Sequence, residues 1–310
     1  MAICKNKIIV LAGPTASGKT ALAIRLATLF NGEIVSADSI QIYRGMDIGS
    51  AKPTEAEKAR IYHHMIDIRD PNEDYSVGDY VKEARSVIES LVAKGTVPFV
   101  VGGTGLYIRG LLGGMLDLPP SDPVVRAALL KEIQEYGQSA LYEKLDRIDH
   151  ESAVRIGAHN TSRMVRALEI FELTGKKMSD LVDEHVFSDR PYDALFLCIT
   201  PDREVLYERI DNRVENMLNT GLLQEVTNLR SMGYSSGLKS MQSLGYRHAA
   251  MILDGEADAG EAARLMKRDT RHYAKRQLTW FRSESDAKWF DPFNISNIEV
   301  CIENFLGQQC

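Results

Sequence analysis

The sequence has few of the residues that build disulfide frameworks or structural zinc sites. Its 310 residues include only four cysteines, which are widely spaced and form no C-x-x-C pair. This spacing excludes a disulfide-rich domain and a zinc ribbon, and it predicts the reduced thiols of a cytoplasmic protein. Cys198 lies in the apolar run 194–199, so we expect it in the hydrophobic core.

Long hydrophobic runs and an excess of positive charge are also missing. No apolar run approaches the ~20 residues that span a bilayer, and no signal-type apolar region follows Lys5 and Lys7. We therefore expect a soluble protein without membrane contact. With 37 Lys and Arg against 43 Asp and Glu, the net charge is −6. This balance excludes a generic polyanion binder, so binding of a nucleic acid would require a local basic patch on the protein.

The most informative stretch is GPTASGKT, which follows the apolar run 8–11 and precedes the helical pattern 21–27. It matches the phosphate-binding loop G-x-x-x-x-G-K-[ST]. Its glycines let successive N–H groups surround one anion, and the helix N-terminus adds partial positive charge. Lys19 adds a full charge, and the Thr20 hydroxyl can bind Mg2+ held by the same phosphates. The predicted polyphosphate-binding residues are Gly13, Pro14, Thr15, Ala16, Ser17, Gly18, Lys19 and Thr20.

Strand and helix signals alternate in the first third of the chain. Apolar strands are expected at 8–11, 33–36 and 97–101, and a Ser-x-x-Asp capping box at Ser76 begins a helix. This alternation is typical of an α/β fold whose parallel sheet is covered on both faces. The segment 62–68 is ambiguous, with a strand as one interpretation.

From Pro119 onward only helical patterns are found, until a strand signal returns at 194–199. We interpret these helices as an insertion in the α/β core. The last third is mostly helical, although 288–306 shows no clear pattern. The expected organisation is a first part of the core at 1–118, a helical insertion at 119–185 and a second part of the core at 186–310.

Asp38 follows the second predicted strand, at the edge of the sheet where α/β proteins bind ligands. Its carboxylate could bind Mg2+, act as a general base or cap a turn, and its position does not decide between these roles. The strand 97–101 ends in Gly-Gly-Thr-Gly, without the second acid of a P-loop ATPase. This lack disfavours a motor or switch. It leaves a small-molecule kinase that uses ATP, or an enzyme whose loop binds another diphosphate.

Two groups of basic side chains are notable in this acidic chain. Arg209 and Arg213 are one helical turn apart and could hold phosphate oxygens together, although for Arg209 we favour a solvated helix face. The segment 267–282 contains six Lys or Arg residues against one Asp, interleaved with aromatic residues. It is therefore a candidate surface for a nucleic-acid backbone. The predicted basic stripe consists of Arg268, Arg271, Lys275 and Arg282.

Seven longer segments occur in an order that is typical of one enzyme family. They are GPTASGKT, ADSIQIYRGMDIGSAKP, HHMIDI, FVVGGTGLYIRGLL, NTSRMVRALEIFELTGK, SMQSLGYRHA and YAKRQLTWFR. In these segments the chain resembles the tRNA dimethylallyltransferases (tRNA isopentenyltransferases), of the bacterial type because no cysteine/histidine finger is found. The resemblance implies a P-loop NTPase-like parallel sheet with an inserted all-helical domain that grips the tRNA anticodon stem-loop. It also implies transfer of a dimethylallyl group from dimethylallyl diphosphate to the exocyclic N6 amine of the adenine 3′-adjacent to the anticodon.

The resemblance also assigns roles to residues. The phosphate loop would bind the diphosphate of the allyl donor, with Thr20 as the Mg2+ ligand. Arg213 would neutralise the leaving diphosphate and Asp38 would be the general base, so the implied catalytic residues are Asp38, Thr20 and Arg213. The implied tRNA-contacting residues are Asp38, Ser39, Ile40, Gln41, Thr104, Arg126, Ser162, Arg163, Met164, Val165, Arg166, Gln242, Ser243, Leu244, Gly245, Tyr246, Arg247, Lys275, Arg276, Gln277, Trp280 and Arg282.

Two positions depart from the family pattern. His272 stands where Arg, Gln or Asn is expected, and His248 where Glu or Gln is common; both concern tRNA contacts and not the chemistry. Two alternatives stay open: the ATP-dependent kinase, which has no use for the basic stripe, and a non-catalytic RNA-binding protein. We expect a cytoplasmic monomer whose partners are tRNA and dimethylallyl diphosphate.

Overall fold

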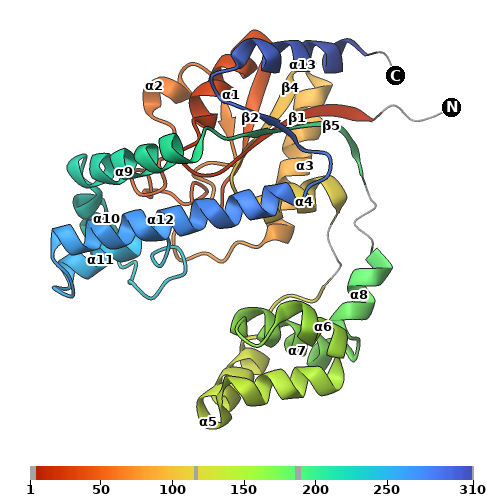
Figure 1. Ribbon diagram of the computed structural model, residues 1–310, viewed down its shortest axis with the longest axis vertical. Helices are drawn as coiled ribbons and strands as arrows, with labels where there is room; N and C mark the ends of the chain where they lie inside the picture. The colour runs from red at the N-terminus through yellow and green to blue at the C-terminus, as the bar shows by residue number, and fades with distance from the viewer. Residues whose placement is uncertain (1–4, 115–117, 186–189, 309–310) are drawn as a thin grey trace. The chain divides into compact units, whose positions relative to one another are not determined.

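The protein consists of two compact units, shown in Figure 1. The structure is a computed structural model that describes residues 5–114, 118–185 and 190–308. One unit comprises residues 1–112 and 190–310, and the other comprises residues 113–189. The second unit thus begins and ends a few residues outside the insertion expected at 119–185.

The first unit is built on a six-stranded sheet of order β3-β2-β4-β1-β5-β6, in which every pair of neighbours is parallel. The central strands are buried over most of their length, because helices cover both faces of the sheet. The expected α/β class and parallel sheet are confirmed. The strands are β1 (Asn6–Ala12), β2 (Gly32–Ala37), β3 (His63–His64), β4 (Val97–Gly102), β5 (Tyr192–Ile199) and β6 (Lys288–Phe290).

Alternate residues of the strands send their side chains into two different cores. Leu195 and Leu197 face a core shared with helices α1 and α13, whereas Phe196 points to the other face and packs against Phe281 of α12, with ring centroids 6.3 Å apart. The helices of this unit are α1 (Lys19–Leu29), α2 (Glu55–Lys58), α3 (Val77–Ala93), α4 (Gly105–Gly113), α9 (Arg203–Asn219), α10 (Leu222–Ser231), α11 (Tyr246–Leu253), α12 (Ala259–Arg282) and α13 (Ile295–Gly307).

A separate apolar cluster joins α9, α10, α11 and α12 to the loop that follows β2. Ile42 and Met46 of this loop are fully buried against Val226 of α10 and Met266 of α12. The loop is therefore packed as firmly as the helices, although it has no regular secondary structure. This packing brings the chain after β2 alongside the C-terminal helices.

The second unit is entirely helical in its described part, as the sequence predicts. Its helices are α5 (Pro123–Ile148), α6 (His150–Ile156), α7 (Thr161–Thr174) and α8 (Met178–His185). Asp122 caps α5 by accepting from the N–H groups of Val124 and Val125, and α5 is kinked at Gly137, where φ is 84°. Leu141 and Met164 belong to the core between α5 and α7.

The structure defines two segments that the sequence left ambiguous or unassigned. Of the ambiguous segment 62–68, only His63 and His64 pair with β2. The unassigned segment 288–306 supplies the edge strand β6 and the helix α13. A three-residue strand is too short to show alternation, which explains why the sequence pattern was not informative there. No helix in the described ranges is both long and apolar enough to cross a membrane.

The docking of α13 on the sheet gives a matched pair of variants. Ile302 is fully buried in the core that α13 shares with α1, whereas Val300 on the same helix is 52% exposed. We expect Ile302→Ala to lower the free energy of unfolding by about 2–5 kcal/mol and Val300→Ala to change it by less than about 0.5 kcal/mol. Urea denaturation followed by circular dichroism measures both. Equal effects of the two variants would contradict this packing of α13.

Candidate active site at the carboxyl edge of the sheet

The phosphate loop connects β1 to α1 and is shaped by its two glycines. Gly18 adopts φ 92°, a left-handed conformation that disfavours any side chain, and lies directly before α1. A Cβ atom on Gly13 would lie 2.2 Å from the carbonyl oxygen of Ile199, so the adjacent strand β5 leaves no room there. The loop therefore has the turn and the helix N-terminus that a polyphosphate site requires.

Lys19 begins α1 and folds back over the loop. Its Nζ donates to the carbonyl oxygen of Pro14 at 2.6 Å and lies 3.4 Å from Ser17 Oγ. Burial, together with the positive charge of Arg213, lowers the pKa of Lys19 to about 8. A bound anion would favour the charged form of the lysine, since opposite charge counters both effects.

Two arginines of α9 reach the same place. Arg213 donates to the carbonyl oxygen of Ser50 at 3.4 Å, and burial lowers its pKa. Arg209 donates from Nη1 to the carbonyl oxygen of Ser17 at 3.2 Å and packs on the ring of Phe293 at 5.1 Å. The preference for a solvated face at Arg209 was therefore wrong: Arg209 lies on the phosphate loop, and Arg213, one helical turn later, lies on the neighbouring segment after β2.

Two cavities meet at Asp38. The larger, of about 660 Å³, is lined by the phosphate loop from Thr15 onward and by both arginines. The smaller, of about 320 Å³, is lined by the segments after β2, before α11 and along α12. Both cavities are lined by Thr15, Asp38, Ser50, Arg213 and Tyr273. A ligand on the phosphate loop and a ligand in the smaller cavity would thus both reach this carboxylate.

Asp38 also shapes the turn after β2. Its Oδ1 accepts from the N–H groups of Ile40 at 2.8 Å and Gln41 at 3.2 Å. Of the three roles that the sequence left open for Asp38, the capping of a turn is therefore observed. This turn fixes the carboxylate at the junction of the two cavities. Within the described ranges, no three His, Cys, Asp or Glu side chains gather as a metal cage.

Helix α12 supports the loop through Gln277. This side chain accepts from the N–H of Thr15 at 2.8 Å and donates to the carbonyl oxygen of Gly103 at 2.8 Å. Trp280, one turn further on, lies against Gly105, where a Cβ atom would approach the ring to 2.2 Å, and Arg109 stacks on the indole at 4.2 Å. Both side chains therefore hold the turn after β4 in place.

Asp269 organises the rim of the smaller cavity. It accepts from Arg247 at 2.5 Å, Arg268 at 2.8 Å and His248 at 3.3 Å. Burial raises the pKa of this carboxyl, but the hydrogen bonds from Arg268, His248 and Arg247 outweigh burial and lower it to about 2. Arg247, which lines the cavity, is thus held in a defined direction.

Only some side chains of the predicted basic stripe lack an acidic partner among the described residues. Arg268 pairs with Asp269, and Arg271 pairs with Asp211 of α9, so neither presents an uncompensated charge. Lys275 and Arg276 are exposed on the same helix, as are Arg282 near its end and His272. Within α12, the exposed positive charge that has no acidic partner is therefore concentrated in the second half of the helix.

Some residues expected to contact tRNA have buried side chains, and for them the expectation is corrected. Met164 and Val165 belong to the core of the helical unit. Tyr246 is fully buried with its hydroxyl on Glu225 at 2.6 Å, and Gln277 is occupied by the loop. Met164 and Val165 pack in an apolar core, and Tyr246 and Gln277 form their hydrogen bonds within the protein. A ligand could therefore reach only the residues beside these four.

Gly245 is buried as well, whereas the remaining expected residues lie on accessible surfaces of their own units. Ser39 and Ile40 line the smaller cavity together with Gln242, Ser243 and Leu244. Thr104 accepts from the N–H of Ser39 at 3.2 Å. In the helical unit Ser162 and Arg163 are exposed, whereas Arg126 and Arg166 are both paired with Glu169, whose side chain is fully buried.

Sequence reasoning missed several residues of the site. Arg209 carried a signal, since it precedes Arg213 by one helical turn. Tyr273 was noted only as an aromatic residue of the basic segment, and it lines both cavities. Ser50, Asp269 and Glu169 carried no local signal, because their roles depend on partners far away in the chain.

Comparison with known proteins identifies the family. A family model described as IPP transferase matches residues 41–284, and a model described as isopentenyl transferase matches residues 6–74. The tRNA dimethylallyltransferase of Geobacter sulfurreducens is 44% identical over 98% of both chains. The tRNA dimethylallyltransferase 2 of Syntrophus aciditrophicus is 47% identical over 97% of both chains.

Solved structures agree with these relatives. The tRNA isopentenylpyrophosphate transferase of Bacillus halodurans superposes with a TM-score of 0.73 at 39% identity, over 97% of both chains. A eukaryotic dimethylallyltransferase acting on tRNA superposes with a TM-score of 0.80 at 29% identity, over 96% of this chain and 77% of that chain. The family model, the nearly full-length relatives and the shared fold show that this chain belongs to the IPP transferase family.

Proposed function

We propose that this enzyme is a tRNA dimethylallyltransferase, which transfers the dimethylallyl group of dimethylallyl diphosphate to the N6 amine of the adenine 3′-adjacent to the anticodon. The observation that carries the proposal is the position of Asp38, which lines both the cavity of the phosphate loop and the smaller cavity beside it. A donor and an acceptor in separate cavities would meet at a carboxylate. The relatives support prenyl transfer to tRNA and do not support the ATP-dependent kinase.

The larger cavity fits the allyl donor. The carbon–oxygen bond between the allyl group and the diphosphate breaks, and negative charge collects on the leaving diphosphate. The loop N–H groups, Lys19 and Arg213 stabilise this charge, and Arg209 is a further cation at the loop. Thr20, which lines the same cavity, would hold Mg2+ through its hydroxyl. Because the described residues form no acidic cage, the diphosphate would have to supply further ligands of the ion. When bound, Mg2+ supplies further charge neutralisation to the leaving group.

The smaller cavity fits an extruded adenine. An adenine amine is a poor nucleophile while it keeps its proton, and a stacked base cannot reach the donor. As the amine attacks the allyl carbon, the bond to carbon forms and the amine proton moves to the Asp38 carboxylate. The rim residues Gln242 and Arg247 would contact nucleotides beside the flipped base.

The exposed cations would bind the tRNA backbone. Lys275, Arg276 and Arg282 supply charge on α12, and Arg163 with Ser162 supplies a polar surface on the helical unit. Arg126 and Arg166 are oriented by Glu169, so their remaining N–H groups have fixed directions. A cytoplasmic location and a monomeric state stay predictions.

Incubation of the enzyme with dimethylallyl diphosphate, Mg2+ and unmodified tRNA, followed by nucleoside mass analysis, tests the proposal. We expect an adenosine heavier by one dimethylallyl group, and ATP with a hydroxylated metabolite should give no transfer. In Asp38→Asn the amide oxygen can still accept the turn hydrogen bonds, but the base is lost. We expect kcat to fall by about 10²-fold or more, with the Kd for tRNA within about twofold of wild type. Loss of tRNA binding with normal single-turnover chemistry would contradict the assigned role.

The support of the loop by Gln277 can be tested separately from the chemistry. Gln277→Leu leaves the N–H of Thr15 and the carbonyl oxygen of Gly103 without partners, each at a cost of about 1–3 kcal/mol. We expect the affinity for inorganic diphosphate, measured by calorimetry, to fall by about tenfold. Lys275→Ala on the same helix serves as the control and should leave this affinity unchanged. Unchanged diphosphate binding in Gln277→Leu would argue against the support.

The tRNA surface of α12 predicts a salt effect. Replacing Lys275 and Arg276 together with Ala should weaken tRNA binding and lower the slope of log K against log salt by about 1.5, because two phosphate contacts are lost. Arg264→Ala on the same helix is the control, since Arg264 lies in the first half of α12, away from the exposed cations, and is paired with Glu261. Filter binding at several salt concentrations measures the slopes. An unchanged slope in the double variant would exclude these two residues from the tRNA contact.

A further inference from the structure

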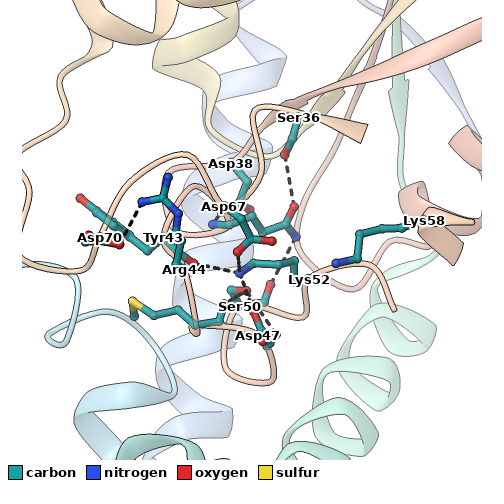
Figure 2. A network of polar contacts seen from close by, with 12 residues as sticks. Ser36, Asp38, Tyr43, Arg44, Asp47, Ser50, Lys52, Lys58, Asp67 and Asp70 are labelled. Atoms are coloured by element: carbon teal, nitrogen blue, oxygen red, sulfur yellow. Dashed lines mark hydrogen bonds and ion pairs between the residues drawn. The ribbon is translucent and has the colours of Figure 1, made fainter. Parts of the chain in front are cut away.

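The buried side chain of Lys52 lies at the centre of a polar network beside the active site (Figure 2). Only 2% of its side chain is exposed. Its Nζ donates to Asp47 Oδ1 at 2.5 Å, Asp67 Oδ1 at 2.5 Å and the carbonyl oxygen of Tyr43 at 2.8 Å. An ammonium group has three donors, so every one has an acceptor and the burial of the charge is fully compensated.

These hydrogen bonds join two irregular segments. Tyr43 and Asp47 belong to the segment 38–53 after β2, whereas Asp67 follows β3. Ala51, next to the lysine, has φ 46°, and Asp67 itself has φ 56°. Residues other than glycine disfavour this conformation, so the surrounding contacts must hold the backbone in place.

The segment that Lys52 holds carries groups of both cavities. Gln41 accepts from Ser36 Oγ at 3.2 Å and donates to the carbonyl oxygens of Ser50 at 3.4 Å and Ala51 at 3.2 Å. The carbonyl oxygen of Ser50 also accepts from Arg213. Asp38 begins the segment, so the base and the contact of the diphosphate-binding arginine both depend on its shape.

We propose that Lys52 is a positioning residue, which holds the segment 38–53 so that Asp38 and Arg213 face the junction of the two cavities. Its neighbours Ser50, Ala51 and Pro53 line the larger cavity. The Lys52 ammonium group does not line it and lies among its three oxygen acceptors (Figure 2). The role of Lys52 in transfer rests on the proposed function. Its role in holding the segment does not, and can be measured without substrates.

Lys52→Met tests the proposal, with Arg44→Met as the matched control. Arg44 lies in the same segment but forms a surface ion pair with Asp70, in which both side chains are about half exposed. We expect Lys52→Met to raise the amide hydrogen exchange rates of residues 38–53 at least tenfold, without a similar change of the rates in β1 or α1. It should lower kcat about 100-fold and leave the Kd for tRNA within threefold. Arg44→Met should change neither exchange nor kcat by more than twofold.

Coupling to Asp38 separates positioning from a general loss of structure. In an Asp38→Asn background the base is already absent and only the contact of Arg213 is left to lose, so Lys52→Met should lower the remaining rate about tenfold or less instead of about 100-fold. If Lys52→Met does not fold, Asp67→Asn replaces it, because this change removes one charged acceptor and keeps the lysine. We expect Asp67→Asn to raise exchange in 38–53 and to lower kcat about tenfold.

The positioning role of Lys52 and the proposed function of the enzyme are overturned by different results. Unchanged exchange in 38–53, a kcat within threefold of wild type, or losses that multiply fully with Asp38→Asn would each overturn the positioning role. A wild-type enzyme that gives no modified adenosine would overturn the proposed function, and the exchange of 38–53 would then still decide whether Lys52 holds the segment.

Discussion

The amide group of Gln277 makes the two hydrogen bonds on which the arrangement of the site depends. It joins the phosphate loop at Thr15 to the turn after β4 at Gly103, and it comes from α12, about 260 residues later in the chain than the loop. A backbone loop that surrounds an anion has few contacts of its own, so it needs such support to keep its shape before the anion binds. Helix α12, which supports the loop, also carries the exposed cations Lys275 and Arg276, so the loop and this basic surface share one rigid element.

The charges of the protein are arranged in local groups that its net charge does not reveal. The chain is acidic as a whole, yet Lys19, Arg209 and Arg213 gather around one cavity, where a bound anion would compensate their charges. Elsewhere, buried or half-buried acids hold cations in fixed directions: Asp269 orients Arg247, and Glu169 orients Arg126 and Arg166. A paired guanidinium retains N–H groups that can still donate, so pairing with an acid is compatible with binding a phosphate.

Local patterns predicted the elements whose physics is local. The phosphate loop was recognisable because an anion cradle between a strand and a helix needs glycines, a lysine and a hydroxyl at fixed spacing. The strands β1, β2, β4 and β5 and the helical unit followed from apolar periodicity. The edge strand β6 did not, and neither did the contact of Arg209, the burial of Tyr246 or the hydrogen bonds of Gln277. These features depend on partners that are close only after the chain has folded.

By itself, the sequence determined the α/β class, the position of the glycine-rich loop between β1 and α1 and, through a long set of motifs, the family. Only the tertiary structure decided which polar side chains face the two cavities and which support them. Asp38 and Lys52 illustrate the difference. Both are charged residues of one irregular segment, yet one lies at the junction of the cavities and the other is enclosed by oxygen atoms. Spacing along the chain cannot distinguish them, because burial and the choice of partner are set by contacts between segments that are distant in sequence.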